Sequence, residues 1–372
     1  GPTRPPAPQR RSVAPGGGGT PVTATARGPS SRDELQPSAN PRRSDVSAFL
    51  VRPDNLFLSA EDISRSLGIA VLLLFMLGLP TRLFNATVRH NRAELVAFFR
   101  PLVNVFAGIT PGAARRALGF AGVSALVAAG VYLFLDPRFP NRPGAAPYAL
   151  GMLIGVGVII TTRLLSARAF MARRLPGIGG GWVVYVGQIA VLAVCVAVSR
   201  LAHLAPGLLL GMAGDYESRR PLTPAQDAAA NTVSYGVRLV VSLTAWFASI
   251  PVAHASEEVG ASSGLLALDV ALTVIALVGM QSIVFALMPL MFLDGYNLAR
   301  ERRGVWIAYW GTGVLWLALV VINPALSHQG EQEASVPWLA GLLVFQALIA
   351  VGLWAFFLMR RRTAAGRSVA HA

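Results

Sequence analysis

The sequence predicts an all-α membrane protein whose chain crosses the bilayer many times. Of its 372 residues, 54% are hydrophobic and only 13% are charged, whereas about 25% of the residues of a soluble globular protein are charged. The apolar residues are gathered into separate runs, and a run of about 20 apolar residues suits a transmembrane helix. Some of the loops that divide these runs are rich in arginine, whereas the loops Pro251–Ser263 and Asn323–Pro337 contain none. We therefore expect about eight transmembrane helices, one short or broken crossing and one amphipathic interfacial helix.

The charges of the chain point to a membrane as its partner. The formal net charge is +14, and all 32 basic residues are arginines. These arginines stand beside apolar runs, where they set orientation in the bilayer, so we expect no nucleic-acid partner. The single cysteine, Cys195, lies inside an apolar run. It excludes an internal disulfide and any metal site built from several cysteines.

Composition divides the chain into three parts. Residues 1–58 are rich in Pro, Gly, Ser and Arg and are predicted to form a disordered stalk. Residues 59–362 carry the apolar runs and form the transmembrane domain, which opens with a capping box at Ser59 and Asp62. Residues 363–372 form a short cytoplasmic tail.

The expected spans follow one another with short connections. Leu83 and Phe84 extend the first span, and Pro80 and Arg82 mark its exit. An amphipathic helix from Phe84 to Phe106, kinked or divided at Pro101, is then expected to lie in the interface. Trp306 and Trp310 are read as part of an aromatic belt. The spans are about Leu67–Leu79, Ala117–Leu135, Tyr148–Leu165, Trp182–Val198, Thr232–Ile250, Gly264–Leu293, Val305–Ile322 and Trp338–Met359.

The stretch Ser199–Gly214 determines the side of the membrane on which each loop is expected to lie. It is apolar but short, with a break at Pro206-Gly207. The loops around Arg168–Arg174 and Arg219–Arg220 are both rich in arginine and should both be cytoplasmic. That is possible only if Ser199–Gly214 brings the chain back across the membrane as a short, broken span; the alternative for this stretch is a re-entrant half-helix. The N-terminus is then extracytoplasmic and the C-terminus cytoplasmic in a bacterial plasma membrane.

Polar groups inside or beside the apolar runs are the candidate functional sites. The central one is Asp294, which follows the longest apolar run and its internal Pro289. We expect Asp294 to pair with Arg238, or failing that with Arg200, and the backbone freed by Pro289 to find partners in protein or water. His203, in the broken crossing, is the remaining candidate. Asp269 is expected to be wetted at the outer interface.

Three short segments resemble one family of membrane proteins. They are Phe285–Leu290 with Leu293-Asp294-Gly295, Leu83-Phe84-Asn85 with Thr87, and Ser199-Arg200-Leu201 with His203. Together they are similar to the actinobacterial FGLLP-motif membrane proteins over roughly Leu67–Arg303. The resemblance implies a topology rather than an activity, and it implies a membrane domain that can be joined to an extracytoplasmic module.

Leu293-Asp294-Gly295 after Pro289 is also similar to a segment of site-2-type intramembrane metalloproteases, in which the aspartate ligates zinc. Those enzymes need two histidines one helical turn apart in H-E-x-x-H. No two of the five histidines of this chain are four residues apart. We therefore expect no catalytic residue, no metal site and no cofactor.

Three classes of function are compatible with these observations. The first is a non-enzymatic membrane anchor or scaffold for an extracytoplasmic module, carried upstream in the chain or supplied by a protein partner, and the N-terminal stalk favours it. The second is a transporter or channel that uses a broken-helix site. The third is a degenerate relative of the site-2 proteases.

Overall fold

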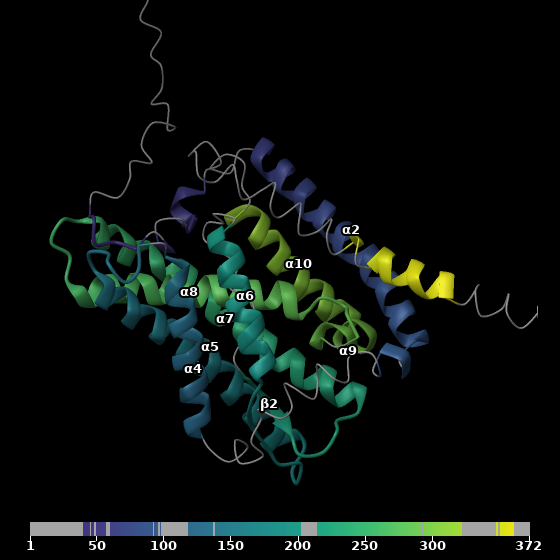
Figure 1. Cartoon of the computed structure of the whole chain (residues 1–372). Coiled ribbons are helices and arrows are strands. Elements are labelled where there is room, and N and C mark those ends of the chain that lie inside the picture. The colour runs from purple at the N-terminus through teal and green to yellow at the C-terminus, as the bar shows by residue number, and fades with distance from the viewer. Residues whose placement is uncertain are drawn as a thin grey trace, which may run out of the picture. The chain divides into compact units, whose positions relative to one another are not determined.

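The computed structural model describes residues 40–44, 46–47, 50–56, 60–91, 93–95, 97, 118–136, 138–201, 214–291, 293–321, 347–348 and 350–360. These residues are mostly helical (Figure 1). The elements in chain order are η1 (Pro53–Asn55), α2 (Ala60–His90), α4 (Leu118–Tyr132), η3 (Leu133–Leu135), α5 (Ala145–Arg174), β1 (Gly180–Val184), α6 (Val186–Leu201), β2 (Gly214–Ser218), α7 (Pro224–Glu257), α8 (Ser263–Ala286), α9 (Asp294–Glu301) and α10 (Arg303–Val320).

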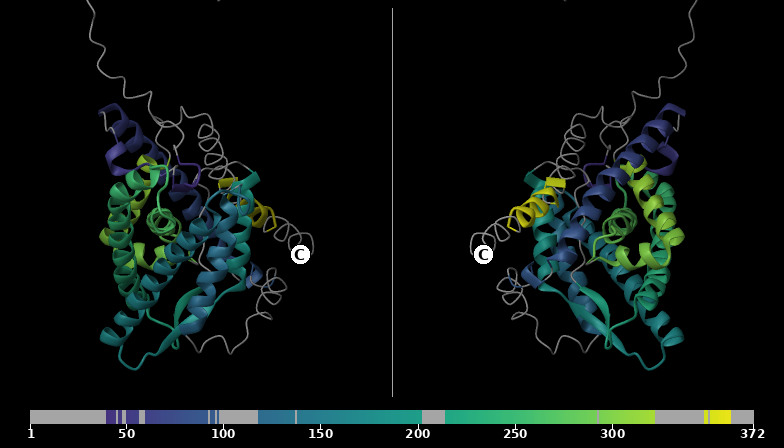
Figure 2. Two further views of the ribbon diagram at one scale, coloured as in Figure 1. Left: turned by 90° about the vertical axis from the view of Figure 1, so that its left-hand side faces the viewer. Right: turned by 90° about the vertical axis from the view of Figure 1, so that its right-hand side faces the viewer.

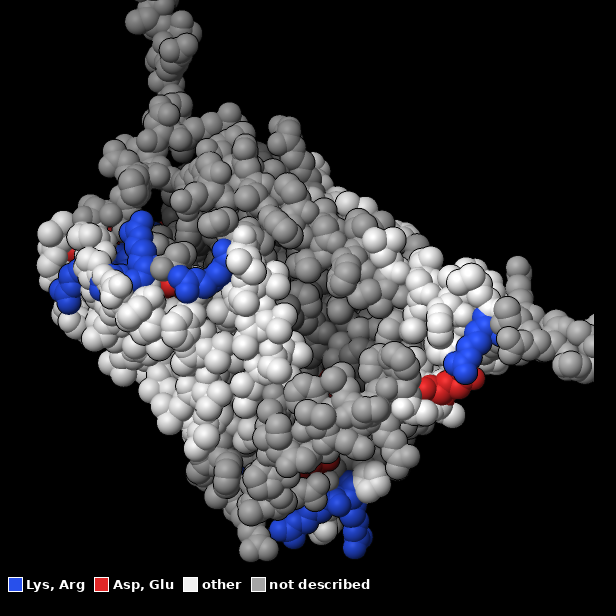
Figure 3. Space-filling model, in the orientation of Figure 1, with Lys and Arg blue, Asp and Glu red and all other residues white. Residues whose placement is uncertain are grey.

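The protein is a helical membrane protein by the length and apolarity of its helices. Among the described residues, five helices are long and apolar enough to cross a membrane, namely α2, α5, α7, α8 and α10. Three shorter apolar helices, Ala121–Leu135, Gly187–Leu201 and Ala350–Arg360, fall where further spans were predicted. Large apolar side chains are exposed along these helices, such as Phe75 and Phe247. On the face shown in Figure 3, the described charged side chains gather at the ends and leave an uncharged surface between them.

Two predicted boundaries are wrong. The first span was expected to end near Pro80, but α2 continues through this proline to His90. Proline removes only one backbone donor, and the apolar residues Leu83 and Phe84 extend the helix into the region that was expected to lie in the interface. The rest of that amphipathic stretch, beyond residue 97, lies outside the described residues. The span expected from Trp182 begins instead as strand β1.

A two-stranded ribbon brings the segment before α6 beside the end of the stretch Ser199–Gly214. Strand β1 pairs with β2 in antiparallel register, with Val184 opposite Gly214 and Gly180 opposite Ser218 (Figure 2). The chain that enters α6 has therefore returned beside its starting point when β2 begins, as the predicted threading requires. Residues 202–213 and with them His203 lie outside the described residues. Trp182 anchors the ribbon to α4, because its Nε1 donates to Ser124 Oγ at 2.9 Å.

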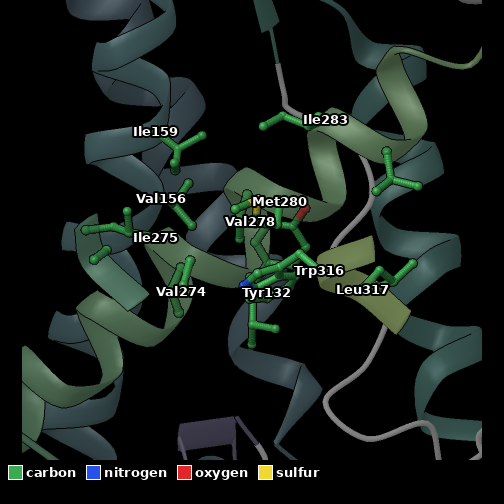
Figure 4. Packing of buried hydrophobic residues seen from close by; sticks show 14 of the residues in the cluster. Tyr132, Val156, Ile159, Val274, Ile275, Val278, Met280, Ile283, Trp316 and Leu317 are labelled. Atoms are coloured by element: carbon green, nitrogen blue, oxygen red, sulfur yellow. The ribbon is translucent and has the colours of Figure 1, made fainter. Parts of the chain in front are cut away.

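Helix α8 forms the centre of the helical packing. Val274, Met280 and Ile283 of α8 are all fully buried, and α8 packs against α5, α7 and α10 (Figure 4). Small residues on α5 allow this close approach. A Cβ on Gly151 would lie 2.4 Å from the Ala267 carbonyl oxygen, and one on Gly155 would lie 2.7 Å from Val274 Cβ. Helices in membranes commonly associate through such small residues.

Candidate functional site

The candidate site is built around the break that follows α8. Pro289 has no backbone N–H and cannot continue the helix, so α8 ends at Ala286 and the Met288 N–H turns to the Phe285 carbonyl at 3.3 Å. The chain resumes as α9 at Asp294. A break in a transmembrane helix leaves backbone groups that must find partners inside the protein.

Three side chains from neighbouring helices supply those partners. Asn85 of α2 donates its Nδ2 to the Pro289 carbonyl at 2.6 Å and accepts the Met291 N–H on its Oδ1 at 3.0 Å. On α10, Trp306 Nε1 donates to the Leu287 carbonyl at 2.8 Å and Trp310 Nε1 donates to the Val284 carbonyl at 2.9 Å. The expectation that protein groups would satisfy the break is confirmed.

Neither Asn85 nor the tryptophans were recognised from the sequence as partners of the break. Asn85 was noted only within a resemblance, and the tryptophans were assigned to an aromatic belt. Trp310 is in fact only 3% exposed. The available signal was a polar Asn that directly follows the apolar pair Leu83-Phe84 in α2, since such a residue must find a hydrogen-bond partner when it is buried.

Gly295 fixes where α9 starts. A Cβ at this position would lie 2.1 Å from the Leu287 carbonyl oxygen and 2.6 Å from the Met288 carbonyl oxygen. Only glycine allows the first turn of α9 to sit directly on the end of α8. This close approach turns Asp294, its chain neighbour, towards α5 and α7.

Asp294 belongs to a cluster centred on Arg163 of α5. Arg163 binds Asp215 of β2 with two hydrogen bonds, Nε to Oδ1 at 2.7 Å and Nη2 to Oδ2 at 3.0 Å. The same Nη2 lies 3.2 Å from Asp294 Oδ2, which also accepts the Tyr235 hydroxyl at 2.7 Å. Arg163 Nη1 donates to Asn231 Oδ1 at 3.3 Å. One guanidinium therefore joins α5, α7, α9 and the ribbon.

The ion pair expected between Asp294 and Arg238 is not formed. Arg238 of α7 donates instead to Ser282 Oγ of α8 at 3.0 Å, and its guanidinium lies 5.0 Å from the ring centre of Tyr235. Arg163 of α5 reaches Asp294 instead, at 3.2 Å, because the break after α8 brings Asp294 towards α5. Arg238 is only 1% exposed, and its Nε and Nη2 have no hydrogen-bond partner among the described residues.

The two carboxylates that share Arg163 differ in proton affinity. Burial raises the pKa of Asp294 above its ordinary value, although the charge of Arg163 opposes this. Burial also acts to raise the pKa of Asp215, but the charge and hydrogen bonds of Arg163, with the Tyr216 N–H, outweigh it and hold that pKa below its ordinary value. Asp294 is therefore the carboxylate of the pair that takes up a proton first as the pH falls.

The surroundings of Asp294 do not fit a zinc ion. Its hydrogen-bond partners are Arg163 and Tyr235, whereas zinc sites in proteins are built from Cys, His, Asp and Glu. Among the described residues, no group of three His, Cys, Asp or Glu side chains could hold a metal ion. Arg200, the second partner proposed for Asp294, lies in the last turn of α6, and Asp294 contacts Arg163 instead.

A second buried polar cluster holds the segment 40–56, which we name the N-terminal latch. This segment was predicted to belong to a disordered stalk ending at residue 58, and that boundary is wrong; residues 1–39 lie outside the described residues. Arg43 donates Nε to Asp269 Oδ2 of α8 at 3.1 Å and Nη1 to Glu257 Oε1 of α7 at 2.8 Å. Asp269, expected to be wetted, is 1% exposed.

Further contacts close the latch over the ends of α7 and α8. Asn40 donates to the Ser256 carbonyl at 3.0 Å, and Trp246 Nε1 donates to the Val51 carbonyl at 2.9 Å. Val46 and Leu50 are each 4% exposed and join the hydrophobic core. Composition did not reveal these contacts, because the segment is rich in small and polar residues and only a few buried apolar residues and one arginine hold it.

Comparison of the chain with protein-family models, with curated proteins and with solved structures found no match.

Replacing Asn85 with alanine should destabilise the break after α8. The substitution leaves the Pro289 carbonyl and the Met291 N–H unpaired, and each unpaired buried group costs about 1–3 kcal/mol. Thermal unfolding in detergent measures the loss. Arg82→Gln, an exposed change one turn away on α2, serves as the control. A melting temperature for Asn85→Ala no lower than that of Arg82→Gln would contradict the assigned role.

Proposed function

We propose that the protein is a non-enzymatic membrane anchor that holds an extracytoplasmic module or protein partner in a fixed position on its outer surface. The N-terminal latch is the observation that carries this proposal. A chain that only needed to leave the membrane would require no contacts beyond its first span. Here the segment before α2 is fastened by buried ion pairs and by hydrophobic residues at the ends of two central helices.

The chemistry of the latch suits a fixed attachment. Arg43 and Asp269 are 4% and 1% exposed in their side chains, so this pair is shielded from water and salt. Arg52 adds a contact to Glu257, and Arg142 binds Asp136 in the turn between η3 and α5. Arg142 also donates to the Arg43 carbonyl, which connects the latch to this turn.

The proposal places the latch outside the cell. The arginines that follow α5, β2 and α9 mark the opposite side as cytoplasmic in a bacterial plasma membrane. About eight transmembrane helices and one short crossing, with residues 202–213 as the return of α6, satisfy this arrangement. The resemblance to the FGLLP-motif membrane proteins agrees with an anchor, since that resemblance also implies an attached extracytoplasmic module.

Arg43→Gln should release the latch. Removing one partner of a buried ion pair costs about 3–5 kcal/mol, because the other charge stays buried alone. Chymotrypsin added to intact spheroplasts should then cut after Leu50, which is 4% exposed in the wild type. Arg220→Gln, an exposed change near the ribbon, should leave the bond after Leu50 protected. An alkaline phosphatase placed before residue 1 should be active in intact cells, because this enzyme folds only outside.

Either of two results would overturn the proposal that the protein is a membrane anchor. One is an inactive phosphatase fusion in cells that make the full-length protein. The other is equal cleavage after Leu50 in the wild type and in Arg43→Gln at matched protein levels. A latch that chymotrypsin opens equally well in both is not a fixed attachment.

Transport is a second candidate function, and the Arg163 cluster favours it. Arg238 is a fully buried cation whose Nε and Nη2 nitrogens have no hydrogen-bond partner among the described residues, and it lies beside a broken helix. Buried ionisable groups and broken helices mark ion and substrate sites in membrane proteins. Flux of protons or chloride into proteoliposomes, abolished by Arg238→Gln, would establish this function in place of the anchor.

A further inference from the structure

A groove lies between the end of α2 and the C-terminal helix Ala350–Arg360, which crosses α2 in Figure 1. Its volume is about 230 Å³. Leu83 and Ala86 of α2 form one wall, and Trp354 and Phe357 of the C-terminal helix form the other. The far end is polar, where His90 and Asn91 line it. The groove thus changes from apolar to polar along its length.

Charged groups stand at the polar end. Arg360 of the C-terminal helix binds Glu94 at 2.9 Å, and Arg89 and His90 are exposed at the last turn of α2. Helix α2 has the length and apolarity of a membrane span. The apolar part of the groove therefore faces hydrocarbon, and its polar end lies where lipid headgroups are found.

We propose that this groove binds an anionic phospholipid. One acyl chain lies between Ala86 and Trp354, and the phosphate is held by Arg89 and His90. The volume supports a single chain, since pockets for drug-sized molecules are larger, about 300–1,000 Å³. The excess of basic over acidic groups at the polar end favours an anionic headgroup over a zwitterionic one. This proposal does not depend on the anchor, because the groove and the latch share no residue.

Tryptophan fluorescence provides the test, since Trp354 lines the groove and is quenched by bromine atoms on a neighbouring acyl chain. The full chain is reconstituted with brominated phosphatidylglycerol or with brominated phosphatidylcholine in an unbrominated background. Subtracting the signal of Trp354→Phe isolates Trp354. We expect phosphatidylglycerol to be preferred by about fivefold for each basic residue engaged. The variant Arg89→Gln/His90→Gln should remove the preference and keep the quenching.

A matched control separates the groove from ordinary lipid contact. Phe356 lies on the same helix, is 54% exposed and does not line the groove. A tryptophan there, introduced as Phe356→Trp with Trp354→Phe, should be quenched equally by the two lipids. Equal quenching by both lipids at position 354 would overturn the proposal. So would a preference at position 354 that Arg89→Gln/His90→Gln leaves unchanged.

Discussion

Replacing Arg163 with glutamine is expected to lower the free energy of unfolding by about 3 kcal/mol, the lower end of the range for breaking a buried ion pair. The change leaves Asp215 and Asp294 close together without their shared cation. Their side chains are 30% and 31% exposed, so water offsets part of the cost and the lower end of the range applies. Thermal unfolding in detergent measures the loss, and Arg168→Gln, exposed on the same helix, is the control.

A double-mutant cycle tests whether Asp294 and Arg163 act as a pair. Asp294→Asn keeps an oxygen that can accept the Tyr235 hydroxyl, so this single change should cost less than Arg163→Gln. Losses that simply add in Arg163→Gln/Asp294→Asn would mean that the two side chains do not interact. Asp294→Asn in an Arg238→Gln background should, by contrast, show a smaller coupling, because these two residues form no hydrogen bond and interact only through their charges and through Tyr235.

The sequence located the central elements of this site but not their partners. Periodicity and apolarity identify α8, the break at Pro289 and the carboxylate at Asp294, because these are properties of neighbouring residues. The contact between Arg163 and Asp294 joins residues 131 positions apart, and the contact between Asn85 and Pro289 joins residues 204 apart. Such contacts depend on how the helices pack, which one apolar pattern does not determine.

Membrane helices make this problem harder than it is in soluble proteins. A lipid-facing side and a buried side are both apolar, so hydropathy indicates that α5 is a span and leaves open which face meets α8. The small residues Gly151 and Gly155 carried that information, because a side chain at either position would collide with α8. They give no information on the partner of Arg163, which contacts β2, α7 and α9.

Gly295→Ala is expected to have an effect of similar size through a different route. The new methyl group would lie 2.1 Å from the Leu287 carbonyl oxygen and 2.2 Å from its carbon. Both atoms belong to the backbone, so no side chain can rotate away and α9 must move off the end of α8. Overpacking of this kind costs about 1–3 kcal/mol, and the movement also draws Asp294 away from Arg163. Gly304→Ala is the matched control, because a Cβ there meets nothing within 4 Å.

The stability lost with the ion pair between Asp294 and Arg163 can be separated from the stability lost through overpacking at Gly295. If Gly295 holds Asp294 in place, Asp294→Asn should destabilise the wild type but change little in a Gly295→Ala background, since the ion pair with Arg163 is already broken. The melting temperatures of the four proteins give this coupling directly. A full loss from Asp294→Asn in both backgrounds would show that α9 absorbs the methyl group without moving its carboxylate, and that the tight contact at Gly295 does not position Asp294.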